Sequence, residues 1–218
     1  MLILFVELFE VSLIVIRTDN NQLTIIFGRK RCGKSCTMAK LASHALKKGQ
    51  TVYCNTPLFF DDDRFHYVDT KFFGHFTPEP HSLYLLDEIN LFWDNRDFKS
   101  FSKDVQKFFR YQGHFKCTVI AFSQTWDCDL KIRSLTDNLF VAKKWFGRLT
   151  VMKRIDKFIT IIPPSENSEG GITEGFQLTP FFVPGSRQFT WLPKWWKLVD
   201  SYSLYDMPTL DDLLKKEG

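Results

Sequence analysis

The sequence has few of the features that mark secreted, disulfide-rich or membrane-spanning proteins. Its five cysteines are odd in number and include no CxxC pair, so we expect neither a disulfide framework nor a zinc site. The start of the chain has neither the basic residues nor the small-residue cleavage site of a signal peptide. No apolar run reaches the roughly 20 residues of a membrane-spanning helix, and no internal repeat is visible. We therefore expect a soluble globular protein from a reducing compartment.

An excess of charge of one sign is also missing. The 29 basic residues are opposed by 25 acidic ones, so the net charge is only +4 and a nucleic-acid groove is allowed but not required. Phenylalanine, by contrast, is abundant, with 23 copies among 218 residues. This abundance predicts either an aromatic core or an aromatic surface that meets a partner. The chain length suits one domain of ordinary size with an appendage.

Residues 1–21 form an extension ahead of the main domain. The first sixteen are almost all apolar but include Glu7 and Glu10, each of which costs about 2–3 kcal/mol at the centre of a bilayer. We expect a buried strand or helix here, or translated sequence upstream of the true start codon. Insertion into a membrane is the alternative.

A phosphate-binding loop is the strongest signal in the chain. Residues 28–35 read GRKRCGKS and satisfy the Walker A pattern GxxxxGK[S/T] without substitution. They follow an apolar run at 22–27, expected as a buried strand, and precede an amphipathic stretch at 36–48, expected as a helix. In this arrangement consecutive backbone N–H groups and a helix N-terminus surround phosphate groups. We therefore predict that the chain binds ATP.

Each residue of the loop has an expected task. The two glycines allow the backbone to curve, Lys34 reaches the β- and γ-phosphates, and the Ser35 hydroxyl coordinates Mg²⁺. The residues predicted to contact the nucleotide are Gly28, Arg29, Lys30, Arg31, Cys32, Gly33, Lys34, Ser35 and Cys36.

An acidic pair follows a second apolar run at 82–86. An aspartate at the carboxyl end of a strand near the loop strand holds Mg²⁺ in other P-loop enzymes, and we assign that role to Asp87. Glu88 would polarise the attacking water. The alternative for such a pair is an ordinary helix N-terminus.

Three further side chains are candidates for catalysis. Residues 116–122 predict a strand inserted between the Walker A and Walker B strands, and Gln124 at its tip would touch the γ-phosphate or the water. Arg110 and Arg133, on helices expected at 97–112 and 127–137, are candidates for the cation that stabilises the transition state. Such a cation often comes from a neighbouring subunit, which would require an oligomer. An exposed surface arginine is the alternative for each.

Strands alternate with helices along the chain. This order predicts an α/β fold of the P-loop NTPase type, with a mostly parallel central sheet and helices on both faces. We place the ATPase core at residues 22–162. Residues 163–218, rich first in proline and then in aromatic residues, are expected to pack back on the core, with a partner or membrane-surface contact as the alternative.

The order of these segments resembles the Zot family, which comprises the N-terminal domain of zonula occludens toxin and the morphogenesis ATPases of filamentous phages. The resemblance spans about residues 22–208 and is carried by LYLLDEINLFWDNR at 83–96, RYQGH at 110–114, TVIAFSQ at 118–124, DLKIRSL at 129–135 and Tyr205-Asp206. It implies a homo-oligomeric ATP-driven motor that assembles and exports single-stranded DNA phage with its coat protein. Such a motor would work in the host cytoplasm at the inner membrane, and single-stranded DNA would be a further partner.

The chain departs from that family in two respects. Many members carry a transmembrane helix after the ATPase domain, and this sequence ends at Gly218 without one. The family also begins close to the loop strand, whereas here an extension precedes it. Contact with a membrane would then come through a partner or through the N-terminus.

Two other functions would use the same residues. A packaging ATPase pumps DNA into a preformed capsid, and its partner would be a portal rather than a coat protein and a membrane. A nucleotide-binding structural subunit with little hydrolysis is the third reading. We would expect such a subunit to lack Lys34 or Glu88, and both are present.

Overall fold

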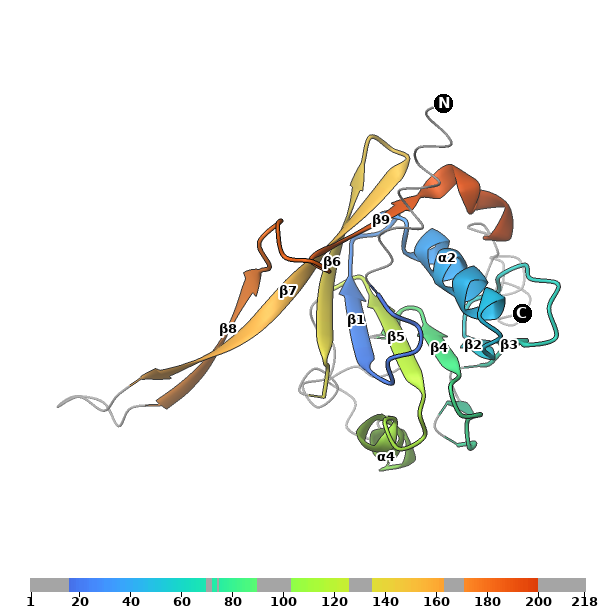
Figure 1. Ribbon diagram of the computed structural model, residues 1–218, viewed down its shortest axis with the longest axis horizontal. Helices are drawn as coiled ribbons and strands as arrows, with labels where there is room; N and C mark the ends of the chain where they lie inside the picture. The colour runs from blue at the N-terminus through green and yellow to red at the C-terminus, as the bar shows by residue number, and fades with distance from the viewer. Residues whose placement is uncertain are drawn as a thin grey trace, which may run out of the picture.

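The chain is described by a computed structural model that covers residues 16–69, 72–73, 75–89, 103–125, 135–162 and 171–199. Within these residues a nine-stranded sheet has the order β3-β2-β4-β5-β1-β6-β7-β8, with β9 paired to β7 (Figure 1). Six neighbouring strands are parallel: β1 Leu23–Phe27, β2 Val52–Cys54, β3 Phe65–Tyr67, β4 Leu83–Leu86, β5 Thr118–Ser123 and β6 Asn138–Trp145. The other three pair antiparallel: β7 Leu149–Ile162, β8 Gly171–Leu178 and β9 Arg187–Trp191.

The strand order confirms the predicted inserted strand. β5 lies between β1, which precedes the phosphate loop, and β4, which precedes the acidic pair. Its Val119 pairs with Leu23 on one side and with Tyr84 on the other. Every residue of β1, β4 and β5 is buried, as expected for parallel strands covered on both faces.

Helices cover the two faces of the parallel sheet. Helix α2 (Lys34–Lys47) packs Met38 and Leu41 against one face, and helix α4 (Lys103–Tyr111) packs Phe108 and Phe109 against the other. The predicted α/β fold with helices on both faces is thus confirmed. α2 begins two residues before the predicted start. The helix expected at 97–112 is described only from residue 103, and most of the one expected at 127–137 lies outside the described residues.

The phenylalanines lie both in the core and on the surface of the described part. On the α4 side, the rings of Phe73, Tyr84, Phe108 and Phe109 form a buried cluster with centroids 4.7–5.8 Å apart. These separations are typical of stabilising edge-to-face contacts. Other large apolar rings are exposed, among them Phe146 and Phe182.

After β6 the alternation of strand and helix stops. Phe146 and Gly147 both have positive φ, +48° and +67°, and such residues reverse the chain within a tight hairpin. β6 therefore continues directly into the antiparallel strand β7. The far half of β7 pairs with β8, and the two strands form an arm that extends away from the rest of the sheet (Figure 1).

The chain then returns from the arm to the core. β9 runs back along β7, and the 3-10 helices η2 (Leu192–Lys194) and η3 (Trp196–Leu198) follow it beside α2 (Figure 1). Lys40 on α2 donates to the carbonyl of Phe189 at 2.6 Å, and Leu192 and Trp195 are buried in the core on that face. Residues 187–199 thus pack on the core; residues 200–218, which include Tyr205-Asp206, lie outside the described part.

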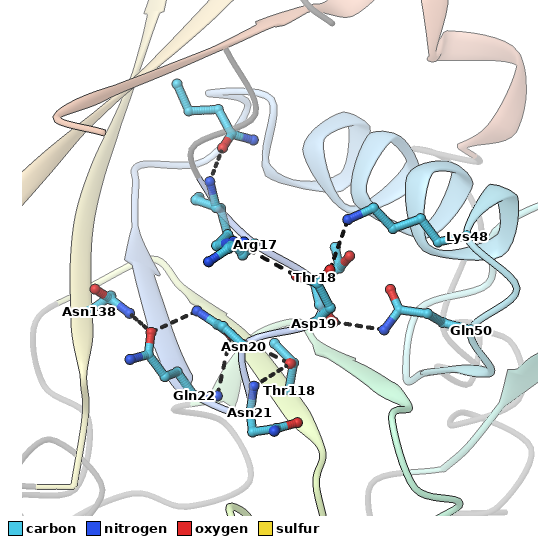
Figure 2. Close-up of polar contacts among 12 residues, drawn as sticks. Arg17, Thr18, Asp19, Asn20, Asn21, Gln22, Lys48, Gln50, Thr118 and Asn138 are labelled. Carbon is cyan, nitrogen blue, oxygen red and sulfur yellow. Dashed lines mark hydrogen bonds and ion pairs between the residues drawn. The ribbon is translucent and has the colours of Figure 1, made fainter. Parts of the chain in front are cut away.

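Polar contacts hold the segment that precedes β1 (Figure 2). They tie it to the turn after α2 and to β5, β6 and β9. The contacts are Ile16 N to Gln188 Oε1, Gln50 Nε2 to Thr18 O, Lys48 Nζ to Asp19 Oδ2, Asn21 N to Thr118 Oγ1 and Asn138 Nδ2 to Gln22 Oε1. The last residues of the predicted extension are therefore anchored; residues 1–15 lie outside the described part. Among the described helices, none has both the length and the apolar character to cross a bilayer.

Candidate functional site

The phosphate loop connects β1 to α2 and needs both glycines of its pattern. Gly33 has a φ of +94°, and a Cβ there would lie 2.1 Å from Thr150 Oγ1 and 2.6 Å from Leu192 Cδ2. A Cβ on Gly28 would lie 2.5 Å from Cys32 Sγ. Both positions therefore exclude side chains. The Gly28 N–H also donates to the Ser123 carbonyl at 3.0 Å, which ties the loop to the end of β5.

Lys34 is buried beneath the loop. Its ammonium donates to the Gly28 carbonyl at 2.8 Å and lies 3.9 Å from Glu88 Oε1. A buried ammonium needs such partners because removing its charge from water is costly. A polyphosphate at the loop would offer it more negative charge than these two partners do, and charge-assisted hydrogen bonds of this kind are the stronger ones.

The predicted acidic pair faces the loop. Asp87 and Glu88 follow β4, and Glu88 accepts a hydrogen bond from the Gln124 amide at the tip of β5. Glu88 takes the left-handed region at φ +50°, and its N–H is held by Asp87 Oδ1 at 2.9 Å. The structure thus brings Lys34, from the start of α2, together with Glu88 and Gln124, which follow the neighbouring strands β4 and β5.

The carboxyl group of Asp87 has a raised pKa. Burial is the main cause, and the charge of Glu88 adds to it, so that the pKa of Asp87 rises from 3.8 to about 6 although Lys34 opposes the shift. Both effects disfavour the ionised form. A cation at this position would relieve both, which fits the oxygen ligands that Mg²⁺ prefers.

Asp87→Asn should stabilise the metal-free and nucleotide-free protein at about pH 7.5. The folded state binds the Asp87 proton more tightly than the unfolded chain, so stability falls as pH rises from 3.8 to about 6 and stays lowered above it. The gain from asparagine should therefore be present at about pH 7.5 and shrink towards about pH 4.5. Urea unfolding in the presence of EDTA measures it, with the exposed Asp63→Asn as control. A variant no more stable than wild type at the higher pH would contradict the prediction.

Asn55 is a member of the site that the sequence analysis missed. Its side chain donates to the Asp87 carbonyl at 3.0 Å and accepts from the Asp87 N–H at 2.6 Å. These two bonds hold the backbone of Asp87 beyond the end of β4. Asn55 follows β2 in the chain and reads as a turn residue; only the sheet order, which places β2 beside β4, reveals its contact.

A cleft of about 640 Å³ opens above the loop. Besides the predicted residues, its lining includes Lys144 from β6 and three apolar residues of the C-terminal segment, none of which the sequence analysis assigned to the site. The charge of Lys144 counteracts the rise that burial causes in the pKa of the Cys36 thiol, as expected for a side chain near the start of α2. The residues that line the cleft are Lys30, Arg31, Gly33, Lys34, Ser35, Cys36, Asp87, Glu88, Gln124, Lys144, Leu192, Trp196 and Val199.

Other predicted residues do not line the cleft. Arg29 is exposed outside it, and Cys32 is buried with its thiol towards Gly28 and its carbonyl bonded to Thr150 Oγ1 at 2.6 Å. Arg110 is exposed in the last turn of α4, at the end of the parallel sheet opposite the phosphate loop (Figure 1). Arg110 therefore cannot reach the site of its own chain. Arg133 lies outside the described residues.

Comparison with known proteins supports the fold. No protein-family model and no curated protein matches the chain. The N-terminal domain of zonular occludens toxin from Neisseria meningitidis superposes with a TM-score of 0.50 at 11% identity, over 82% of this chain and 98% of that one. At this identity the likeness shows a shared P-loop NTPase fold and no more.

Two further structures are less similar. The DNA-packaging ATPase B204 from Sulfolobus Turreted Icosahedral Virus gives a TM-score of 0.47 at 11% identity, over 62% of this chain and 93% of that one. The flagellar accessory protein FlaH from Methanocaldococcus jannaschii gives 0.46 at 15% identity, over 62% and 77%.

Proposed function

We propose that this chain is an ATPase that binds ATP with Mg²⁺ in the cleft above the loop. The observation that carries the proposal is the contact of Lys34, Glu88 and Gln124 beneath a glycine loop, at the carboxyl ends of adjacent parallel strands. The Ser35 hydroxyl and the Asp87 carboxylate would hold the metal ion, which would neutralise charge on the phosphates.

The chain's own residues divide the remaining work. Lys34 exchanges its contacts with Gly28 and Glu88 for phosphate oxygens, which leaves the Glu88 carboxylate to accept a proton from the attacking water. Gln124 holds Glu88 and keeps that carboxylate turned towards the loop. Backbone N–H groups of the loop after Gly28 would surround the phosphates.

The larger task we propose is assembly and export of single-stranded DNA phage. Two observations support it: the ordered motifs resemble the Zot family, and the fold is shared over 82% of the chain with a zonular occludens toxin domain. The proposed protein is a homo-oligomer that works with a coat protein at the cytoplasmic side of the host inner membrane. Packaging of DNA into a capsid would use the same site and is distinguished by the DNA that stimulates it.

ATP hydrolysis with and without DNA tests this function. We expect Mg²⁺-dependent hydrolysis by the wild-type chain, stimulated several-fold by circular single-stranded DNA. Stimulation by double-stranded DNA alone would favour packaging and contradict export. Absence of hydrolysis under every condition would contradict the ATPase proposal itself.

Arg110 should act on a neighbouring subunit if it acts in catalysis. It lies far from the phosphate loop of its own chain, so it would act on the loop of a neighbouring subunit. Arg110→Ala should then lower hydrolysis by about a hundredfold or more, because the cation that stabilises the transition state is lost. Mixing it with Glu88→Gln should then restore part of the activity, because some interfaces combine an intact Arg110 with an intact Glu88. Lys107→Ala, on the same helix and also exposed, serves as the control. Full activity of Arg110→Ala, or no recovery on mixing, would contradict a role in trans.

Asn55→Asp should weaken the metal site without unfolding the protein. The substitution keeps the acceptor for the Asp87 N–H but places an oxygen against the Asp87 carbonyl. Loss of one such bond and the added repulsion should raise the Mg²⁺ concentration for half-maximal hydrolysis by about tenfold. Asn20→Ala, at the opposite end of the sheet, is the control. An unchanged Mg²⁺ requirement would show that Asn55 does not position Asp87.

A further inference from the structure

The cleft above the phosphate loop is lined by side chains of two chemical kinds. Lys30, Arg31, Lys34 and Lys144 supply positive charge around the loop, whereas Leu192, Trp196 and Val199 supply an apolar wall from the C-terminal segment. A nucleoside triphosphate has the matching division into an anionic chain and an aromatic base. The volume of about 640 Å³ is within the range of pockets that enclose ligands of this size.

Trp196 differs from its neighbour Trp195 in how much of its side chain is exposed. Trp195 is 8% exposed and belongs to the core, whereas Trp196 is 52% exposed and borders the cleft. The core therefore does not account for the ring of Trp196. An indole that borders a ligand cleft offers a surface on which any nucleobase can stack.

The segment that carries Trp196 is fixed on both sides. Before it, Leu192 is buried and lies so close to Gly33 that a Cβ on the glycine would sit 2.6 Å from Leu192 Cδ2. After it, the Leu198 carbonyl accepts from the Phe59 N–H at 3.1 Å, and Val199 bridges to Leu58. The wall is therefore preformed beside the loop, and a ligand would not have to order it.

We propose that Trp196 is the base-stacking residue of the nucleotide site, so that the C-terminal segment recognises the nucleobase while the loop recognises the phosphates. This inference rests on the proposed function, because it assumes that the loop binds a triphosphate. Since indole stacks on every base, the residue contributes affinity for nucleosides and does not select adenine over guanine.

Binding measurements with ATP, GTP and inorganic tripolyphosphate distinguish recognition of the base from recognition of the phosphates. In Trp196→Ala the affinity for ATP and for GTP should fall by about tenfold or more, while the affinity for tripolyphosphate stays unchanged. Trp196→Phe should keep most of the nucleotide affinity. The exposed Phe182→Ala is the control and should leave all three affinities unchanged. ATP should also quench tryptophan emission in the wild type, and Trp196→Phe should lose that change.

Four outcomes would overturn the inference. Unchanged ATP affinity in Trp196→Ala would exclude stacking, and an equal loss for tripolyphosphate would indicate a structural role. If the wild type binds ATP and tripolyphosphate with equal affinity, the base contributes nothing and the inference fails. Loss of both affinities in Lys34→Ala would then still support the phosphate site. If neither ligand binds the wild type, the proposed function fails together with the inference.

Discussion

Glu88→Gln is expected to slow ATP hydrolysis by about a hundredfold or more while ATP binding is kept. Removal of a positioned general base costs about 10²–10⁴ in rate. The glutamine still offers an oxygen to the Gln124 amide, so the contact between β4 and β5 is retained. The substitution also removes a negative charge that lies 3.9 Å from Lys34 and beside Asp87. Without that charge, the site repels an incoming triphosphate less.

Single-turnover hydrolysis with enzyme in excess, together with an ATP binding isotherm, measures this effect. Glu79→Gln is the matched control, because Glu79 is an exposed carboxylate that bonds Thr51 at the other end of the sheet. Hydrolysis by Glu88→Gln at the wild-type rate would remove Glu88 from the mechanism. Loss of ATP binding would instead give it a role in ligand recognition.

Lys34→Ala should abolish measurable ATP binding, with a loss of affinity of about a hundredfold or more. The ammonium is the buried positive charge that faces the loop, and without it Asp87 and Glu88 remain as uncompensated negative charges beside the phosphates. Hydrolysis should disappear with binding. Tripolyphosphate binding should be lost as well, because the effect lies at the phosphate loop.

Lys34 is buried, so its substitution also changes the stability of the folded protein. Lys34→Met keeps most of the side-chain volume and should show the same loss of binding with a smaller change in stability than Lys34→Ala, as followed by thermal unfolding. Lys47→Ala, exposed at the other end of α2 and outside the cleft, is the control and should retain binding. ATP binding by Lys34→Met at wild-type affinity would contradict the assignment of the loop.

The local pattern predicted the central strands well because each of them is buried on both faces. The runs predicted at 22–27, 82–86 and 116–122 appear as β1, β4 and β5, with bounds that differ by two residues at most. The start of α2 was predicted two residues late, because Lys34 and Ser35 were assigned to the loop although the helix begins directly after Gly33. The positive φ of that glycine marks the boundary, and Thr150 and Leu192 fill the space that a Cβ there would need.

The direction of the later strands could not be predicted from apolar periodicity. A run such as 149–162 shows that a strand forms but not whether its neighbour is parallel or antiparallel. The hairpin at Phe146 and Gly147 decides this through two residues of positive φ. For the same reason, the sequence did not predict that the segment after residue 162 adds β8 and β9 to the same sheet.

The sequence by itself determined the chemistry of the phosphate loop and of the acidic strand, because a loop pattern and a buried strand are local properties of the chain. It therefore predicted Lys34, Asp87, Glu88 and Gln124 as parts of one site. Only the tertiary structure decided what surrounds them. Asn55 and Trp196 join the site from β2 and from the C-terminal segment, whereas Arg110 lies at the opposite end of the sheet. Contacts between residues so distant in the chain depend on strand order and on the return of the chain across α2, and neither leaves a local signal.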